Sequence, residues 1–258
     1  GLVLLDASTC LVTVACTMAV RQALASGASQ RAASQPGDDR DVMAGWRTIT
    51  ASSGLRALVV LMTLATLAIG VIQVLIKPIL LPTVSTAEMG VVETVAATGM
   101  LVGAALVTAW KSAQPTTLLA AGLAGTGAAM TLVPLGPGAW WVAACGFLTF
   151  ACLPLSQAGA EVLVRTQVDN TRQARTWGTI SLVTQMGYLV AYLCSGVLVD
   201  HVLQPLLEPG GSLSTSVGAV VGIGPGRGAA LLVGLMGAVM ALVALAVRLQ
   251  RRRLASPQ

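Results

Sequence analysis

The sequence predicts an all-α, polytopic membrane bundle, because seven long apolar stretches with almost no charge alternate with short polar breaks. Each stretch is close to the ~20 residues that a helix needs to cross about 30 Å of hydrocarbon. Polar and apolar residues do not alternate with a period of two, so strands are excluded as the spanning element. The predicted spans are residues 2–20, 55–76, 89–110, 116–135, 139–164, 177–199 and 228–247.

The composition also indicates a membrane protein. Charged residues make up 10% of the chain, against about a quarter in soluble domains. All of the 15 basic residues except Lys77 and Arg227 fall in breaks on one side of the predicted membrane. The positive-inside rule therefore predicts a cytoplasmic C-terminus and a cytoplasmic break between the first two spans. The net charge of +5 is explained by this orientation signal, so it indicates no nucleic-acid partner.

The sequence offers few residues suited to metal binding, cofactor binding or hydrolysis. The five cysteines fall inside predicted spans without zinc-ligand spacing, and His201 is the single histidine. No credible nucleophile and base are present, so we expect no enzyme, no metal and no cofactor. The segment GPGRGA matches G-x-G-x-x-A, but no strand precedes it, which argues against a dinucleotide site.

Three segments are expected along the chain. Residues 1–20 form one span, residues 21–54 a cytoplasmic linker with an amphipathic helix, and residues 55–258 a group of six spans. The helix is suggested by Val42, Trp46 and the apolar positions that follow, although a plain extension of the next span is an equal alternative. The chain enters an apolar span directly at its start, without a basic signal-peptide region, so we expect it to be part of a longer membrane protein.

Polar side chains at membrane depth usually face a cavity or a partner helix. Such side chains form stripes on the second, fifth and sixth spans, and the third span carries Glu93, whereas the fourth and seventh spans lack a stripe. We therefore expect four helices to line a path and the fourth and seventh to lie outside against lipid. Gly99 and Gly103 form a small-residue motif expected to pack helices closely. The candidate substrate contacts are Thr66, Gln73, Thr149, Ser156, Gln185, Tyr188 and Tyr192.

Glu93 is the most informative single residue. Antiparallel packing of the second and third spans would bring Gln73 and Lys77 to a similar depth. Because burial and nearby cations move the pKa of a carboxylate in opposite directions, Glu93 could carry a proton whose release depends on the state of the cavity. The alternative, at even odds, is a static hydrogen bond or an ion pair with Lys77.

Three segments give the chain a family resemblance: VVETVAATGMLVGAAL, the loop after AEVLVRTQ, and DHVLQPLLEPGG followed by GIGPGRGAALL. The chain resembles the C-terminal half of a major facilitator superfamily transporter, closest to macrolide-efflux-like drug exporters. Residues 1–20 resemble the sixth of twelve helices, and the rest resembles helices seven to twelve. The pattern departs at Ala174 and Arg175, where the family usually has Gly-Arg, and in the reduced loop WKSAQP.

The resemblance implies two six-helix halves that rock around a substrate bound near the midplane. It thereby implies a secondary active transporter in the plasma membrane, exporting amphipathic small molecules or drugs by proton antiport. Its partners would be the lipid bilayer, the small-molecule substrate and an N-terminal half of the same transporter. The alternative is a membrane-embedded sensor or interaction domain that keeps the fold without transporting.

Overall fold

The computed structural model describes residues 11–18, 43–110, 112–136 and 138–249, and the regular structure in these ranges is helical. The chain divides into two units, residues 1–42 and residues 43–258. In the first unit, residues 11–18 are helical. The rest of the predicted first span lies outside the described residues, and so does the predicted linker up to residue 42.

The second unit contains six helices that are long and apolar enough to cross a membrane, which confirms predicted spans two to seven as helices. The fourth of these spans ends in a short 3₁₀ turn, η1 (Val133–Leu135). The six helices are α3 (Ser53–Leu80), α4 (Thr86–Ala109), α5 (Pro115–Leu132), α6 (Ala139–Gln167), α7 (Gln173–Leu198) and α10 (Arg227–Leu249). Five of the six helices begin one to four residues before the predicted limit, and α3, α6 and α10 end two to four residues beyond it.

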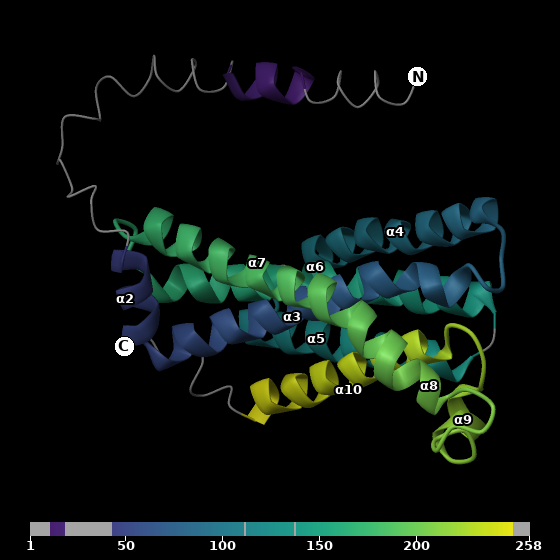
Figure 1. Ribbon diagram of the computed structural model, residues 1–258. Helices are drawn as coiled ribbons and strands as arrows, with labels where there is room; N and C mark the ends of the chain where they lie inside the picture. The colour runs from purple at the N-terminus through teal and green to yellow at the C-terminus, as the bar shows by residue number, and fades with distance from the viewer. Residues whose placement is uncertain (1–10, 19–42, 111, 137, 250–258) are drawn as a thin grey trace. The chain divides into compact units, whose positions relative to one another are not determined.

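These helices lie side by side and pack in a definite order (Figure 1). Helix α6 packs against α4 and α5, α10 packs against α5 and α3, and α3 packs against α7. The predicted role of Gly99 and Gly103 is confirmed. A Cβ atom on Gly99 would collide with the carbonyl oxygen of Phe147, and one on Gly103 with that of Ala151, so both glycines let α4 approach the backbone of α6.

Helix α5 differs from the prediction, which placed it outside the bundle. It is the most buried of the six helices. In the most apolar stretch of α5, 61% of the residues are buried, against 22% in α4 and in α7. Gly122 faces the backbone of Ser156 on α6, and Gly127 faces Gly237 on α10. The small, apolar character of α5 therefore reflects close packing between two helices rather than contact with lipid.

The short helix predicted after the linker is present as α2 (Met43–Ala51). It lies across the end of the bundle where α3 and α7 begin, and it contacts both of them (Figure 1). Ile49 is buried, whereas Trp46 is exposed. The helix ends before Ser52, whose side chain accepts a hydrogen bond from the backbone N–H of Leu55 and caps α3, so α2 is not an extension of α3. The compact unit therefore begins at Met43, earlier than the predicted boundary at residue 55.

The break between α7 and α10 is more ordered than the predicted loop. Helix α7 continues through a π-helical turn, η2 (Val199–Leu203), into α8 (Gln204–Leu206), and α9 (Val217–Val221) follows. The chain bends before α10 at three glycines, Gly222, Gly224 and Gly226, whose φ angles of 89°, 119° and 78° favour glycine. The Gln204 side chain stabilises this bend, since its Nε2 donates a hydrogen bond to the carbonyl oxygen of Gly224 at 3.1 Å.

Candidate ligand-binding pockets

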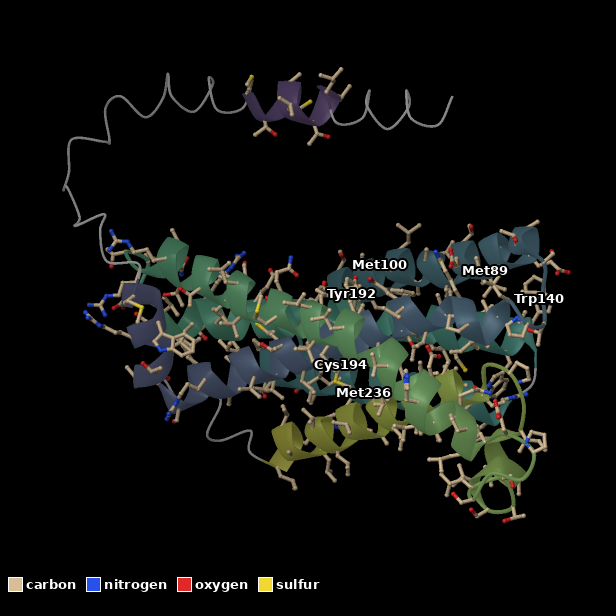
Figure 2. The ribbon with its side chains drawn as sticks, in the orientation of Figure 1. Met89, Met100, Trp140, Tyr192, Cys194 and Met236 are labelled. Atoms are coloured by element: carbon tan, nitrogen blue, oxygen red, sulfur yellow. The ribbon has the colours of Figure 1, made fainter. Side chains whose placement is uncertain are left out.

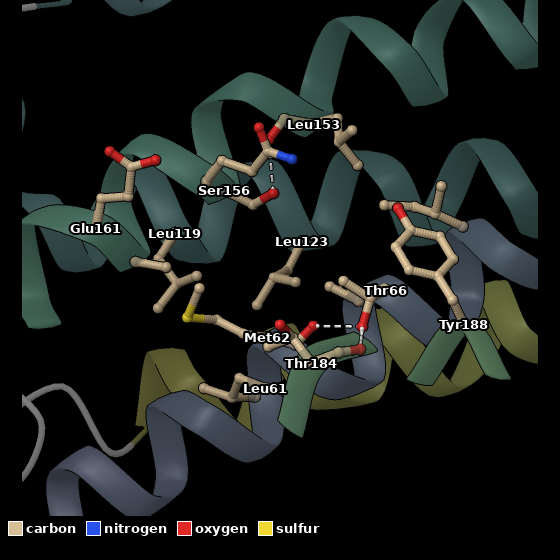
Figure 3. A pocket seen from close by; sticks show the side chains of 14 residues that line it. Leu61, Met62, Thr66, Leu119, Leu123, Leu153, Ser156, Glu161, Thr184 and Tyr188 are labelled. Carbon is tan, nitrogen blue, oxygen red and sulfur yellow. Dashed lines mark hydrogen bonds between the residues drawn. The ribbon is translucent and has the colours of Figure 1, made fainter. Parts of the chain in front are cut away.

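Two pockets lie between helices of the bundle. The first, here called the Tyr188 pocket, has a volume of about 270 Å³ and is walled by α3, α5, α6 and α7 (Figure 3). Helix α5 contributes Leu119 and Leu123, so a helix expected to stand outside the path forms part of this wall. The pocket is mainly apolar, and its polar members are Thr66, Ser156, Gln157, Glu161, Thr184 and Tyr188.

Most hydroxyl groups of the Tyr188 pocket are already engaged with backbone carbonyls. Thr66 Oγ1 donates across the helix interface to the carbonyl oxygen of Thr184 at 2.9 Å, and Ser156 Oγ donates to that of Leu153 at 2.8 Å (Figure 3). Each hydroxyl has a single proton to donate. The Ser156 bond lies within α6. Thr66 Oγ1, by contrast, has acceptors both in its own helix, at Thr63, and on α7, at Thr184. Both hydroxyls therefore offer a ligand only their oxygen lone pairs.

Gln157 and Glu161 are the polar groups of this pocket with most hydrogen-bonding capacity left. No hydrogen bond joins the Gln157 carboxamide to any other described residue. Glu161 Oε2 lies 3.8 Å from Arg165 Nη2, and the two side chains are 52% and 64% exposed, so this pair is weak. A carboxylate and a carboxamide one helical turn apart therefore face an apolar cavity.

The second pocket, here called the Glu93 pocket, has a volume of about 290 Å³ and is walled mainly by α3, α4 and α6. Its wall is formed by aliphatic residues and Phe150, with two polar residues, Gln73 and Glu93. The predicted similar depth of Gln73 and Glu93 is confirmed by their presence in one pocket. Lys77 is exposed and does not line it, and no ion pair joins Lys77 to Glu93, both of which the structure describes. The structure therefore does not contain the static ion pair between Glu93 and Lys77 that was the alternative to a proton carrier.

The two pockets meet at a hydrogen-bonded pair. Tyr192 Oη donates to Gln73 Oε1 at 2.9 Å, and the Tyr192 ring centroid lies 6.0 Å from that of Tyr188. Gln73 lines one pocket and Tyr188 the other. Figure 2 shows Tyr192 midway along the bundle, while Met89 and Trp140 lie near the end opposite to α2.

The structure thus gathers five of the predicted contact residues around the two pockets: Thr66, Gln73, Ser156, Tyr188 and Tyr192. Three predicted contacts are not among the lining residues of either pocket. Tyr192 reaches the Glu93 pocket only through its hydrogen bond to Gln73. Gln185 is exposed on α7, and Thr149 is buried, with its hydroxyl donating to the carbonyl oxygen of Cys145 at 2.8 Å.

Gln157 was not predicted from the sequence, and Glu161 was interpreted as a capping or snorkelling residue, yet both line the Tyr188 pocket. Gln157 directly follows the predicted polar stripe of its span, one position off the stripe. Glu161 lies close to the predicted end of the span, where charged residues usually reach the headgroups. A strongly polar carboxamide inside a predicted span was itself the available signal for Gln157.

Comparison with family models, curated proteins and solved structures finds no match for this chain. Among the described residues, no group of three His, Cys, Asp or Glu side chains is arranged to hold a metal ion. The arrangement described above is therefore the basis on which a function is proposed.

Proposed function

We propose that this chain is part of a secondary active transporter in the plasma membrane that exports amphipathic small molecules in exchange for protons. The observation that carries the proposal is the Glu93 pocket, where an exposed carboxylate and an exposed carboxamide line an otherwise apolar wall. Ligand sites of this kind are mostly apolar, with a few polar groups that orient the ligand. Polar side chains on helices that are apolar enough to cross a membrane are typical of transport paths.

Glu93 is the proposed proton carrier. It carries no ion pair or hydrogen bond to any described residue, so no fixed partner in this part of the chain holds it in its charged form. In the proposed cycle Glu93 takes up a proton when the pocket is open to one side of the membrane and releases it on the other.

The positions of the two pockets are consistent with a transport path between helices. The pockets fall between α3, α4, α6 and α7, the four helices that the polar side chains predicted to line a path, with a contribution from α5. We infer further that the C-terminus is cytoplasmic and that an N-terminal half completes the path. In the most apolar stretches of α4 and α7, only 22% of the residues are buried. The exposed sides of these two helices are therefore suited to contact with an N-terminal half.

Reconstituted vesicles test this function. The full transporter, in which this chain is joined to the proposed N-terminal half, is inserted into vesicles with an imposed pH gradient, and the movement of radiolabelled cationic, neutral and anionic amphipaths is followed. Gradient-dependent accumulation that a protonophore abolishes is expected for at least one of them. Saturable binding without any gradient-dependent movement would instead favour the sensor alternative.

A further inference from the structure

The two pockets share a composition that transport alone does not require. Each holds one carboxylate and one carboxamide, namely Glu161 with Gln157 in the Tyr188 pocket and Glu93 with Gln73 in the Glu93 pocket. Among the residues that line them, neither pocket has a lysine or an arginine. Each pocket therefore presents one carboxylate to a ligand, although Arg165, which is not a lining residue, lies 3.8 Å from the carboxylate of Glu161.

This composition selects a chemical class of ligand. A carboxylate accepts hydrogen bonds and favours a cation, whereas a carboxamide NH₂ donates. In the Glu93 pocket Tyr192 already donates to Gln73 Oε1, so the NH₂ group of Gln73 is the part left for a ligand. A small organic cation with a hydrogen-bond acceptor on an apolar body would complement both pockets, whereas an organic anion would complement neither.

The pockets are consecutive along the bundle rather than merged. On α3 the Tyr188 pocket extends to Ile69 and the Glu93 pocket begins at Ile72, and on α6 the corresponding limits are Leu153 and Phe150. The hydrogen bond from Tyr192 to Gln73 lies at this boundary. Their volumes of about 270 and 290 Å³ are nearly equal, so the same small ligand fits either one.

We propose that the Tyr188 pocket and the Glu93 pocket are two separate binding sites for one class of ligand, small organic cations that carry a hydrogen-bond acceptor. Glu161 is the charge partner of the first site and Glu93 of the second. This inference rests on the proposed function for the identity of the ligand as a transported molecule, but the two sites are detected by binding alone. Arg165 competes with the ligand for Glu161 at the first site, because its Nη2 lies 3.8 Å from Glu161 Oε2.

Photolabelling tests the proposal with the purified full chain in nanodiscs of zwitterionic lipid. The probe is 4-benzoylbenzyltrimethylammonium, which combines a fixed positive charge, a ketone acceptor and an apolar body, and inserts into nearby C–H bonds on illumination. Mass spectrometry should find two sets of labelled residues. One set falls in residues 61–69 and 153–160, and the other in residues 72–79 and 92–97.

Substitutions then separate the two sites. Glu161→Gln should reduce labelling of the first set about tenfold or more and leave the second set unchanged, and Glu93→Gln should do the converse. Arg165→Gln should increase labelling of the first set, a gain that misfolding cannot mimic. The matched control is Arg172→Gln, which removes an exposed arginine outside both pockets and should change neither set.

Several results would overturn the proposal. Loss of both sets on a single carboxylate substitution would indicate one shared site. Labelling by anionic 4-benzoylbenzoate at the level of the cationic probe would exclude cations as the class. Transport is scored separately: independent sites without gradient-driven flux would leave this inference standing and remove the proposed function. Gradient-driven flux together with a single labelled set would remove this inference and leave the proposed function standing.

Discussion

Tyr192 on α7 donates a hydrogen bond to Gln73 on α3, with 2.9 Å between Oη and Oε1. The bond joins two helices that also pack closely at Gly70, whose added Cβ would lie 2.7 Å from that of Ala191. Between helices in lipid such a bond is worth about 0.6 kcal/mol on average and up to roughly 1.7 kcal/mol. It is therefore a modest link that can break and re-form when a ligand passes the boundary between the two pockets.

The first prediction concerns this bond. Tyr192→Phe removes the donor and keeps the ring, so the free energy of unfolding should fall by about 0.5–1.5 kcal/mol. Tyr188→Phe is the matched control, because no described residue accepts a hydrogen bond from its hydroxyl and its removal should cost less. Denaturant titration of both variants in mixed micelles measures the difference. Equal losses in the two variants would show that the Tyr192 bond contributes nothing to stability.

Glu93 is the subject of the second prediction. Glu93→Gln keeps the shape of the side chain but removes its charge, so pH-driven export should fail while a cationic ligand still binds in the Tyr188 pocket. Flux in vesicles and equilibrium binding are measured in parallel. The control is Glu88→Gln, a carboxylate on the same helix that accepts the backbone N–H of Ser85 in a capping box and lies outside both pockets. Unimpaired gradient-driven export by the Glu93 variant would remove this residue from the coupling mechanism.

Orientation is tested by labelling cysteines from outside the cell. In a variant without the native cysteines, Ser212→Cys in the break between α7 and α10 should react with a membrane-impermeant maleimide. Ser256→Cys should react only after permeabilisation, because the basic residues near it favour the cytoplasmic side. Reaction of position 256 in intact cells would reverse the proposed topology.

The helices could be predicted from the sequence because each depends only on its own run of apolar residues. About twenty apolar residues between polar breaks leave the backbone no other way to satisfy its hydrogen bonds in lipid, so the six long helices of the second unit could be recognised one at a time. The small-residue motif of Gly99 and Gly103 was also local, since both glycines lie on one face of a single helix. Its partner helix, α6, could not be named from the motif.

Relations between helices were harder to predict. The lack of a polar stripe on α5 was interpreted as contact with lipid, yet the same composition suits a helix packed between α6 and α10. Thr66 and Ser156 reached a pocket as expected, but their hydroxyl protons are bonded to backbone oxygens, which polarity patterns do not reveal. Lys77 shares a helix face with Gln73, and only the course of α4 determines that Glu93 meets Gln73 and not Lys77.

The last prediction tests whether α5 and α10 really approach through glycine. A Cβ atom on Gly237 would lie 2.6 Å from the carbonyl oxygen of Gly127 and 2.7 Å from Met130 Cβ, so Gly237→Ala should push the helices apart and lower the free energy of unfolding by about 1–3 kcal/mol. The control is Gly178→Ala on α7, where nothing lies within 4 Å of the added Cβ. There the higher helix propensity of alanine should raise stability by up to about 1 kcal/mol. Opposite signs in the same denaturation assay are expected. If Gly237→Ala were also stabilising, α5 would not be packed against α10, and its apolar surface would be available to lipid as the sequence first suggested.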